Sequence, residues 1–136
     1  MVYFSVKHPV AWMGQQNLLD TEGNVFRVDQ LGTLPSTLPR FIGPLGQQKY
    51  LMEAYQQWMP LLAPLALTIK TLQWNPRQFW SLRLSNGLQL YLGNEKPTQQ
   101  LARFVKVYPD VLVNKVAMIE YIDLRYAQGM AVKFRH

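Results

Sequence analysis

The sequence contains no cysteine and only two histidines, His8 and His136. The absence of cysteine excludes disulfide bonds, thiolate nucleophiles and cysteine-ligated zinc sites. The eight Asp and Glu residues are dispersed, and none is spaced with a histidine in the way that metal ligands are. A hydrolase needs a nucleophile beside a base, and a final residue and a residue before proline are poor candidates for that base. We therefore expect no catalytic residue, no metal site and no cofactor.

Long apolar runs are also missing. The longest, residues 59–67, contains two prolines and is far too short to cross a membrane as a helix. Lys7, His8 and Pro9 occupy the positions where a signal peptide would have its apolar segment. We therefore predict neither a membrane span nor a signal peptide within this sequence.

The composition is that of one folded domain. A length of 136 residues, of which 49% are apolar, allows a packed core. Fourteen Lys and Arg against eight Asp and Glu give a net charge of +6, which suits nucleic acid, an anionic membrane surface or an acidic protein. The basic residues nowhere form a run of three, so no phosphate-binding stretch is visible.

Apolar spacing predicts two helices. In residues 47–62 the apolar positions recur every three or four residues, and Pro60 and Pro64 should end that helix. In residues 99–108 a similar face is present, with Thr98 as the N-cap and Pro109 closing the helix.

Residues rich in β-branched and aromatic side chains predict the strands. An Asn86-Gly87 turn is the strongest hairpin signal, and the Pro- and Gly-rich residues 29–46 predict an irregular loop. The predicted strands are residues 2–6, 10–12, 18–19, 25–28, 67–74, 78–84 and 88–92. Together with the helices they predict an α+β domain in which two helices pack on a curved, largely antiparallel sheet.

The last stretch, residues 119–134, predicts a closing hairpin with its turn at residues 127–129. Its second arm alternates Met130, Val132 and Phe134 with Ala131, Lys133 and Arg135, so one face should be apolar and the other solvated. We expect this arm to be an exposed edge strand, open to the strand of a partner.

The same stretch carries a family resemblance. The pattern Asp-Leu-Arg-Tyr-x-x-Gly-x-Ala-Val in residues 123–132 resembles the closing hairpin of the FtsQ/DivIB family of bacterial cell-division proteins. Further pieces of the family follow in the right order over nearly the whole chain, at residues 8–12, 19–26, 38–46, 90–93 and 101–109.

The resemblance implies a non-enzymatic scaffold that binds the FtsB/FtsL (DivIC/FtsL) complex by β-augmentation and helps to localise and regulate septal peptidoglycan synthesis. It also implies the periplasmic face of the inner membrane at the division septum, with a membrane-spanning helix in the full-length protein that is absent here. Residues 1–9 would end a POTRA domain and its hinge, and residues 10–136 would be the β domain.

Carried over residue by residue, the resemblance places partner contacts at Arg77, Arg125, Tyr126, Gln128 and Gly129. An arginine can bind a partner carboxylate bidentately, and a tyrosine is a rigid aromatic anchor. The edge strand would pair through its backbone at Met130, Ala131, Val132, Lys133 and Phe134. We expect Arg125 and Tyr126 to flank a surface turn, so that even Arg125→Glu should leave folding nearly intact. Gln128 and the Lys133-Phe134 pair depart from the family's usual residues, which puts the contacts at the turn in question.

Two other functions are compatible with the sequence. The first alternative is a basic nucleic-acid-binding module, whose affinity for unrelated oligonucleotides would fall steeply with salt. The second is a peptidoglycan-glycan binder that uses Trp12, Trp58, Trp74 and Trp80, although Trp58 and Trp80 occupy positions that favour core packing.

Overall fold

The fold is described here from a computed structural model, which describes residues 9–13, 17–20, 25–27 and 38–135. The predicted strand at residues 2–6 and the first half of the predicted loop at 29–46 lie outside these residues. The strands are β1 Pro9–Met13, β2 Asn17–Asp20, β3 Val25–Arg27, β4 Arg40–Ile42, β5 Ile69–Trp74, β6 Phe79–Leu84, β7 Gln89–Gly93, β8 Ile119–Asp123 and β9 Ala131–Phe134, and the α-helices are α1 Gln48–Leu62 and α2 Pro97–Val107.

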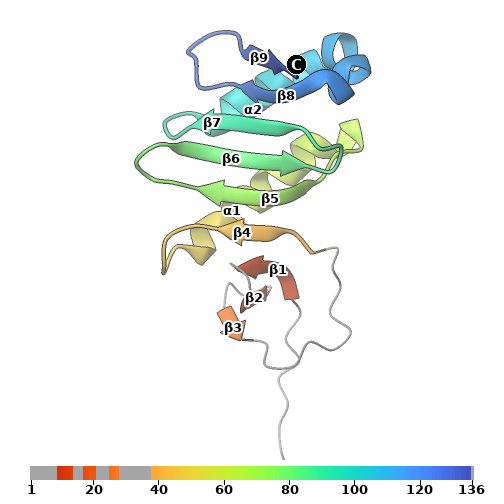
Figure 1. The fold of residues 1–136 in the computed structure, drawn as a ribbon. Coiled ribbons are helices and arrows are strands. Elements are labelled where there is room, and N and C mark those ends of the chain that lie inside the picture. The colour runs from red at the N-terminus through yellow and green to blue at the C-terminus, as the bar shows by residue number, and fades with distance from the viewer. Residues whose placement is uncertain (1–8, 14–16, 21–24, 28–37, 136) are drawn as a thin grey trace, which may run out of the picture.

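The strands form one sheet in the order β3-β2-β1-β4-β5-β6-β7-β8-β9 (Figure 1). Five of its eight neighbouring pairs are antiparallel. Two of the three parallel pairs, β4 with β5 and β7 with β8, are joined by crossovers that contain α1 and α2. The predicted α+β class, with a largely antiparallel sheet and two helices on it, is confirmed.

Both helices cover the same face of the sheet (Figure 1). Alternate residues of β6 and β7 are buried on that face, while the residues between them are half-buried or exposed. The largest fully buried side chains are Trp58, Trp80, Phe41 and Phe104, which come from α1, β6, β4 and α2. No helix of the described residues is long and apolar enough to cross a membrane.

Two tryptophans form the centre of the core. The rings of Trp58 and Trp80 meet edge to face with centroids 4.9 Å apart, and Trp74 stacks on Trp80 at 5.4 Å. Trp58 and Trp80 are each 1% exposed, which leaves neither ring available to a glycan or a base. The prediction that these two residues pack in the core is confirmed.

Two local predictions, one about a proline and one about a loop, were wrong. Pro60 does not end the first helix, which continues to Leu62 and then tightens into a 3-10 turn. Because Pro60 is exposed, the carbonyl that its ring leaves without a helical partner can be hydrated. The second α-helix does end before Pro109, at Val107, and a π-helical turn, Tyr108–Leu112, continues from it. The predicted loop at 29–46 contains β4, whose Phe41 is fully buried and which pairs in parallel with β1 and β5.

Thr98 does not cap the second helix. That helix begins one residue earlier, at Pro97, with Lys96 in the N-cap position. The hydroxyl of Thr98 instead accepts a hydrogen bond of 3.0 Å from the indole Nε1 of Trp58. This bond joins the two helices beside the buried ring of Trp58.

The turn predictions agree with the structure. Gly87 has a φ of 90° and joins β6 to β7, and Gly129 has a φ of 75° in the connection between β8 and β9. A residue with a side chain is strained at such a φ, so glycine is favoured at both positions. The predicted pairing of residues 18–19 with 25–28 is present as the antiparallel pair of β2 and β3.

The Trp58–Thr98 hydrogen bond yields a stability prediction. Thr98→Val keeps the shape of the side chain but leaves a buried indole N–H without its acceptor, which typically costs about 1–3 kcal/mol. We expect urea titration to show a free energy of unfolding lower by about that amount. Thr98→Ser, which keeps a hydroxyl, is the control and should lose less; equal stability of Thr98→Val and the unmodified chain would contradict the assignment.

Candidate functional site

The candidate site is the open edge of the sheet at β9. This strand is the last in the sheet order, and among the described residues only β8 pairs with it. The backbone N–H of Arg135 donates to the carbonyl of Met118 over 2.8 Å, so it points toward β8. Because backbone groups alternate in direction along a strand, those of Val132 and Phe134 point away from β8. The outer edge is therefore a row of donors and acceptors available for pairing.

The two faces of β9 differ in chemistry, as the alternation predicts. Met130 and Val132 pack partly against the core on the helix side, where Val132 lies opposite the buried Ile122. Phe134 is on the same face but is 47% exposed. Ala131 and Lys133 are exposed on the other face, where Lys133 lies opposite Tyr121. The edge thus presents an apolar side and a cationic side.

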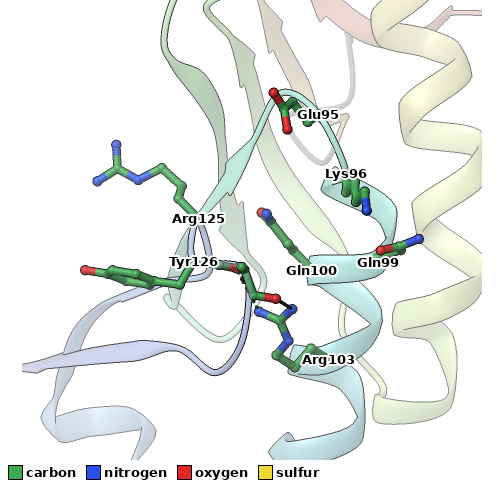
Figure 2. A pocket seen from close by; sticks show the side chains of 8 residues that line it. Glu95, Lys96, Gln99, Gln100, Arg103, Arg125 and Tyr126 are labelled. Carbon is green, nitrogen blue, oxygen red and sulfur yellow. Dashed lines mark hydrogen bonds between the residues drawn. The ribbon is translucent and has the colours of Figure 1, made fainter.

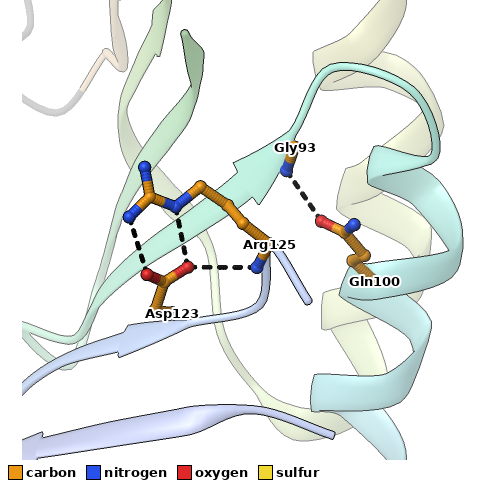
Figure 3. Close-up of polar contacts among 4 residues, drawn as sticks. All are labelled: Gly93, Gln100, Asp123 and Arg125. Carbon is orange, nitrogen blue, oxygen red and sulfur yellow. Dashed lines mark hydrogen bonds and ion pairs between the residues drawn. The ribbon is translucent and has the colours of Figure 1, made fainter. Parts of the chain in front are cut away.

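Arg125 is fixed by a carboxylate of its own chain. Its Nε and Nη2 donate to the two carboxylate oxygens of Asp123 at 2.8 and 2.7 Å, and its backbone N–H donates to the same carboxylate at 3.0 Å (Figure 3). The guanidinium also lies over the rings of Phe79 and Tyr91, with centroids at 4.6 and 5.7 Å. Hydrogen bonding from the Arg125 side chain lowers the pKa of Asp123, against the opposing effect of burial.

This pairing changes two expectations about Arg125. Asp123 already uses Nε and Nη2, so Nη1 is the nitrogen that remains for a partner carboxylate. Arg125→Glu would also place a second carboxylate beside the buried Asp123, and the two like charges would repel. That substitution should therefore lower stability, and it is unsuited to separating binding from folding.

Residues 126–129 are an exposed part of the connection between β8 and β9. Tyr126 is 51% exposed, and its side chain points away from α2, as does that of Arg125 (Figure 2). The backbone of this loop is held by Arg103 of α2. Arg103 Nη1 donates to the carbonyls of Gly129 at 2.7 Å and Tyr126 at 3.2 Å, and its Nη2 donates to the carbonyl of Ala127 at 2.8 Å.

Arg103 was not predicted as a site residue. Its loop partners are 23 to 26 residues away in the sequence, and they offer backbone atoms that no residue pattern reveals. Arg103 lies outside the helix face formed by the buried Leu101 and Phe104, so its position in the sequence gave no signal of a partner within the fold.

A cavity of about 300 Å³ lies between the first turns of α2 and residues 125–127 (Figure 2). Gln100 forms part of its lining and is only 8% exposed. The side-chain oxygen of Gln100 accepts a hydrogen bond of 2.7 Å from the backbone N–H of Gly93, which joins α2 to the end of β7 (Figure 3). The cavity is therefore lined both by Gln100, which contacts β7, and by Arg103, which contacts the loop before β9.

Arg77 lies at the same end of the sheet as Arg125. It is in the turn between β5 and β6, where its backbone N–H donates to the side chain of Asn75 at 3.0 Å. Phe79, two residues later, pairs with Gly93 and has the guanidinium of Arg125 over its ring. Arg77 is exposed and makes no ion pair with a described residue. Among the described residues, no group of His, Asp or Glu is placed to hold a metal ion.

Comparison with known proteins gives a consistent result. A family model for the C-terminal part of the cell division proteins FtsQ and DivIB matches residues 10–125. Cell division protein FtsQ of Escherichia coli strain K12 is 36% identical over 91% of this chain and 46% of its own length. The same protein of Burkholderia pseudomallei is 34% identical over 92% of this chain and 51% of its own, and that of Coxiella burnetii is 30% identical over 96% and 53%. The chain spans about half the length of the curated relatives it matches.

The lowered pKa of Asp123 predicts how stability depends on pH. Since the folded chain favours the charged carboxylate, this group stabilises the fold above its unfolded pKa, and that contribution is lost as the pH falls through the lower, folded pKa. At pH 7 the free energy of unfolding of Asp123→Asn should be about 1 kcal/mol lower than that of the unmodified chain. Below about pH 4 the variant should lose less additional stability than the unmodified chain does.

Urea titration over a pH series measures both effects. Asp110→Asn, which removes an exposed carboxylate after α2, is the control and should leave the acid-induced loss nearly unchanged. If Asp123→Asn had the same acid dependence as the unmodified chain, the Arg125 pairing would not be the source of that stability.

Proposed function

The chain belongs to the FtsQ/DivIB family of cell division proteins, and on that premise we propose that it is a non-enzymatic scaffold of the division machinery. It binds the FtsB/FtsL (DivIC/FtsL) complex by accepting a strand of that partner at β9. Through this contact it helps to localise and regulate septal peptidoglycan synthesis. The family membership supports the role in cell division, and the open edge supports the mode of binding.

The single observation that carries the proposal is the unpaired outer edge of β9. Main-chain hydrogen bonds to an added strand supply affinity that depends little on the partner's side chains. Val132 and Phe134 direct their backbone groups outward, so two residues of β9 are available for this pairing. Tyr126, which precedes the strand and is half exposed, adds an aromatic anchor.

The faces of β9 specify the kind of strand that fits. A partner residue on the helix side would lie beside Val132 and the exposed ring of Phe134, which favours an apolar side chain. A residue on the opposite side would lie beside Lys133, which favours a carboxylate. We therefore propose a partner strand that alternates apolar and acidic residues. A carboxylate elsewhere in the partner would be bound by Arg77 together with Nη1 of Arg125.

The remaining parts of the proposal concern the whole protein. Residues 10–136 form the β domain, and the domain works at the periplasmic face of the inner membrane at the division septum. A membrane-spanning helix outside this sequence anchors the full-length protein. No enzymatic activity is part of this role, and the protein acts through contacts alone.

Tyr126→Ala tests the anchor at this edge. Truncation of an interface anchor often costs 2 kcal/mol or more, so we expect binding to the cognate FtsB-like protein to weaken about thirtyfold. Because Tyr126 is half exposed, the melting temperature should stay close to that of the unmodified chain. Isothermal titration calorimetry and a thermal melt of each variant measure the two quantities.

The control for Tyr126→Ala is Leu45→Ala. Leu45 is a fully exposed apolar residue in the turn between β4 and α1, far from β9 in the sheet order. It should bind as the unmodified chain does. Unchanged binding by Tyr126→Ala would remove this residue from the interface, and a collapsed melting temperature would assign it to the core instead.

Phe134→Pro tests the backbone of the edge directly. Proline removes an N–H that points away from β8, so the pairing of β8 with β9 is spared while an added strand loses a donor. We expect Phe134→Pro to weaken binding at least tenfold more than Phe134→Ala, which removes the ring but keeps the donor. Equal affinities of the two variants, at equal melting temperatures, would argue against strand addition at this edge.

A further inference from the structure

We infer that Arg103 is a positioning residue for the partner-binding edge: it holds residues 126–129, and with them Tyr126 and the start of β9, in the geometry that the partner recognises. The inference rests on the proposed function. Arg103 lies in α2, outside the edge strand, and it contacts the loop from the helix side of the sheet.

The contact is made by one guanidinium and three carbonyls. Nη1 bonds Gly129 and Tyr126, and Nη2 bonds Ala127, at 2.7, 3.2 and 2.8 Å. A guanidinium is planar and carries its donors in a fixed arrangement, so it can fix several acceptors relative to one another. The loop carbonyls are therefore held in one arrangement with respect to α2.

The loop has few other means of staying ordered. Among the described residues, no backbone-to-backbone hydrogen bond is made within residues 126–130. The residues between Tyr126 and Gly129 are all exposed, and the first apolar side chain that packs on the core is Met130. Arg103 thus supplies the polar contacts that fix this loop to the rest of the domain.

The position of Arg103 itself is well determined. Its helix is held in place by the buried side chains of Leu101 and Phe104, which precede and follow Arg103 in the sequence. The helix is also joined to β7 through Gln100 and to α1 through Thr98. The core therefore positions α2, and α2 positions the loop and the start of the edge strand.

Order in the loop matters for affinity because binding has to fix Tyr126 and the first residues of β9. A loop that is already fixed loses less conformational entropy when the partner binds. Without the guanidinium, partner binding also has to order residues 126–129, and we expect this entropy cost to reduce the binding free energy. Lysine can replace the arginine only in part, since a single ammonium does not span the three carbonyls as the guanidinium fork does.

The test compares Arg103→Ala and Arg103→Lys with Lys106→Ala, an exposed cation on the same helix. The probe is the purified periplasmic part of the cognate FtsB-like protein, titrated into the 136-residue chain. We expect Arg103→Ala to weaken binding about tenfold, Arg103→Lys to restore only part of the loss, and Lys106→Ala to bind normally.

A double-mutant cycle with Tyr126→Ala separates positioning from a general loss of stability. If Arg103 acts through the loop, the fold-loss of the double variant should be smaller than the product of the two single losses, because both remove the same contact. Amide relaxation by NMR should in addition show increased motion at residues 127–129 in Arg103→Ala and not in Lys106→Ala. Multiplicative losses without such motion would overturn the inference.

The outcomes also separate this inference from the proposed function. Normal binding by Tyr126→Ala and Phe134→Pro would remove the proposed interface altogether. Weak binding by those variants together with normal binding by Arg103→Ala would overturn the role of Arg103 alone. If Arg103→Ala melts at a lower temperature, Arg103→Lys decides: reduced affinity at an unchanged melting temperature supports positioning, and full affinity contradicts it.

Discussion

The proposed function depends on one feature of the sheet: β9 makes backbone hydrogen bonds on only one of its two sides. Each inner strand has neighbours on both sides, whereas β9 is bonded to β8 alone among the described residues. An exposed row of backbone donors and acceptors invites a further strand, so natural sheets usually protect such edges. Here the edge is short and carries Lys133 outward, which limits unspecific pairing and favours an acidic partner.

The edge is positioned from the core in successive steps. Trp58 and Trp80 fix α1 against the sheet, and Thr98 ties α2 to α1 through the indole of Trp58. From α2, Arg103 reaches the loop that starts β9. On the other face of the sheet, Asp123 holds Arg125 over the ring of Phe79. The exposed residues that we propose for binding are therefore supported by buried or paired ones, which makes a surface site rigid.

Local sequence patterns located both α-helices, the turns and the other described strands, but they missed β4 and the contacts between the elements. Apolar spacing located both helices, and Gly87 and Gly129 marked the turns because their φ values exclude other residues. Thr98 was misassigned as a cap because its partner, Trp58, is 40 residues away. Asp123 and Arg125 are only two residues apart in the sequence, but their ion pair depends on β8 ending at Asp123. The Arg103 contact uses backbone carbonyls, which every residue type carries, so the sequence does not reveal it.

Amide hydrogen exchange of β9, measured by NMR with and without the cognate FtsB-like protein, tests strand addition most directly. In the chain alone, the amide of Arg135 is already bonded to Met118, whereas those of Val132 and Phe134 point outward. The account predicts that the partner slows exchange at Val132 and Phe134 and changes that of Arg135 little. Unchanged exchange at both outward amides under saturating partner, with protection appearing elsewhere on the chain, would contradict the assignment of β9 as the binding edge.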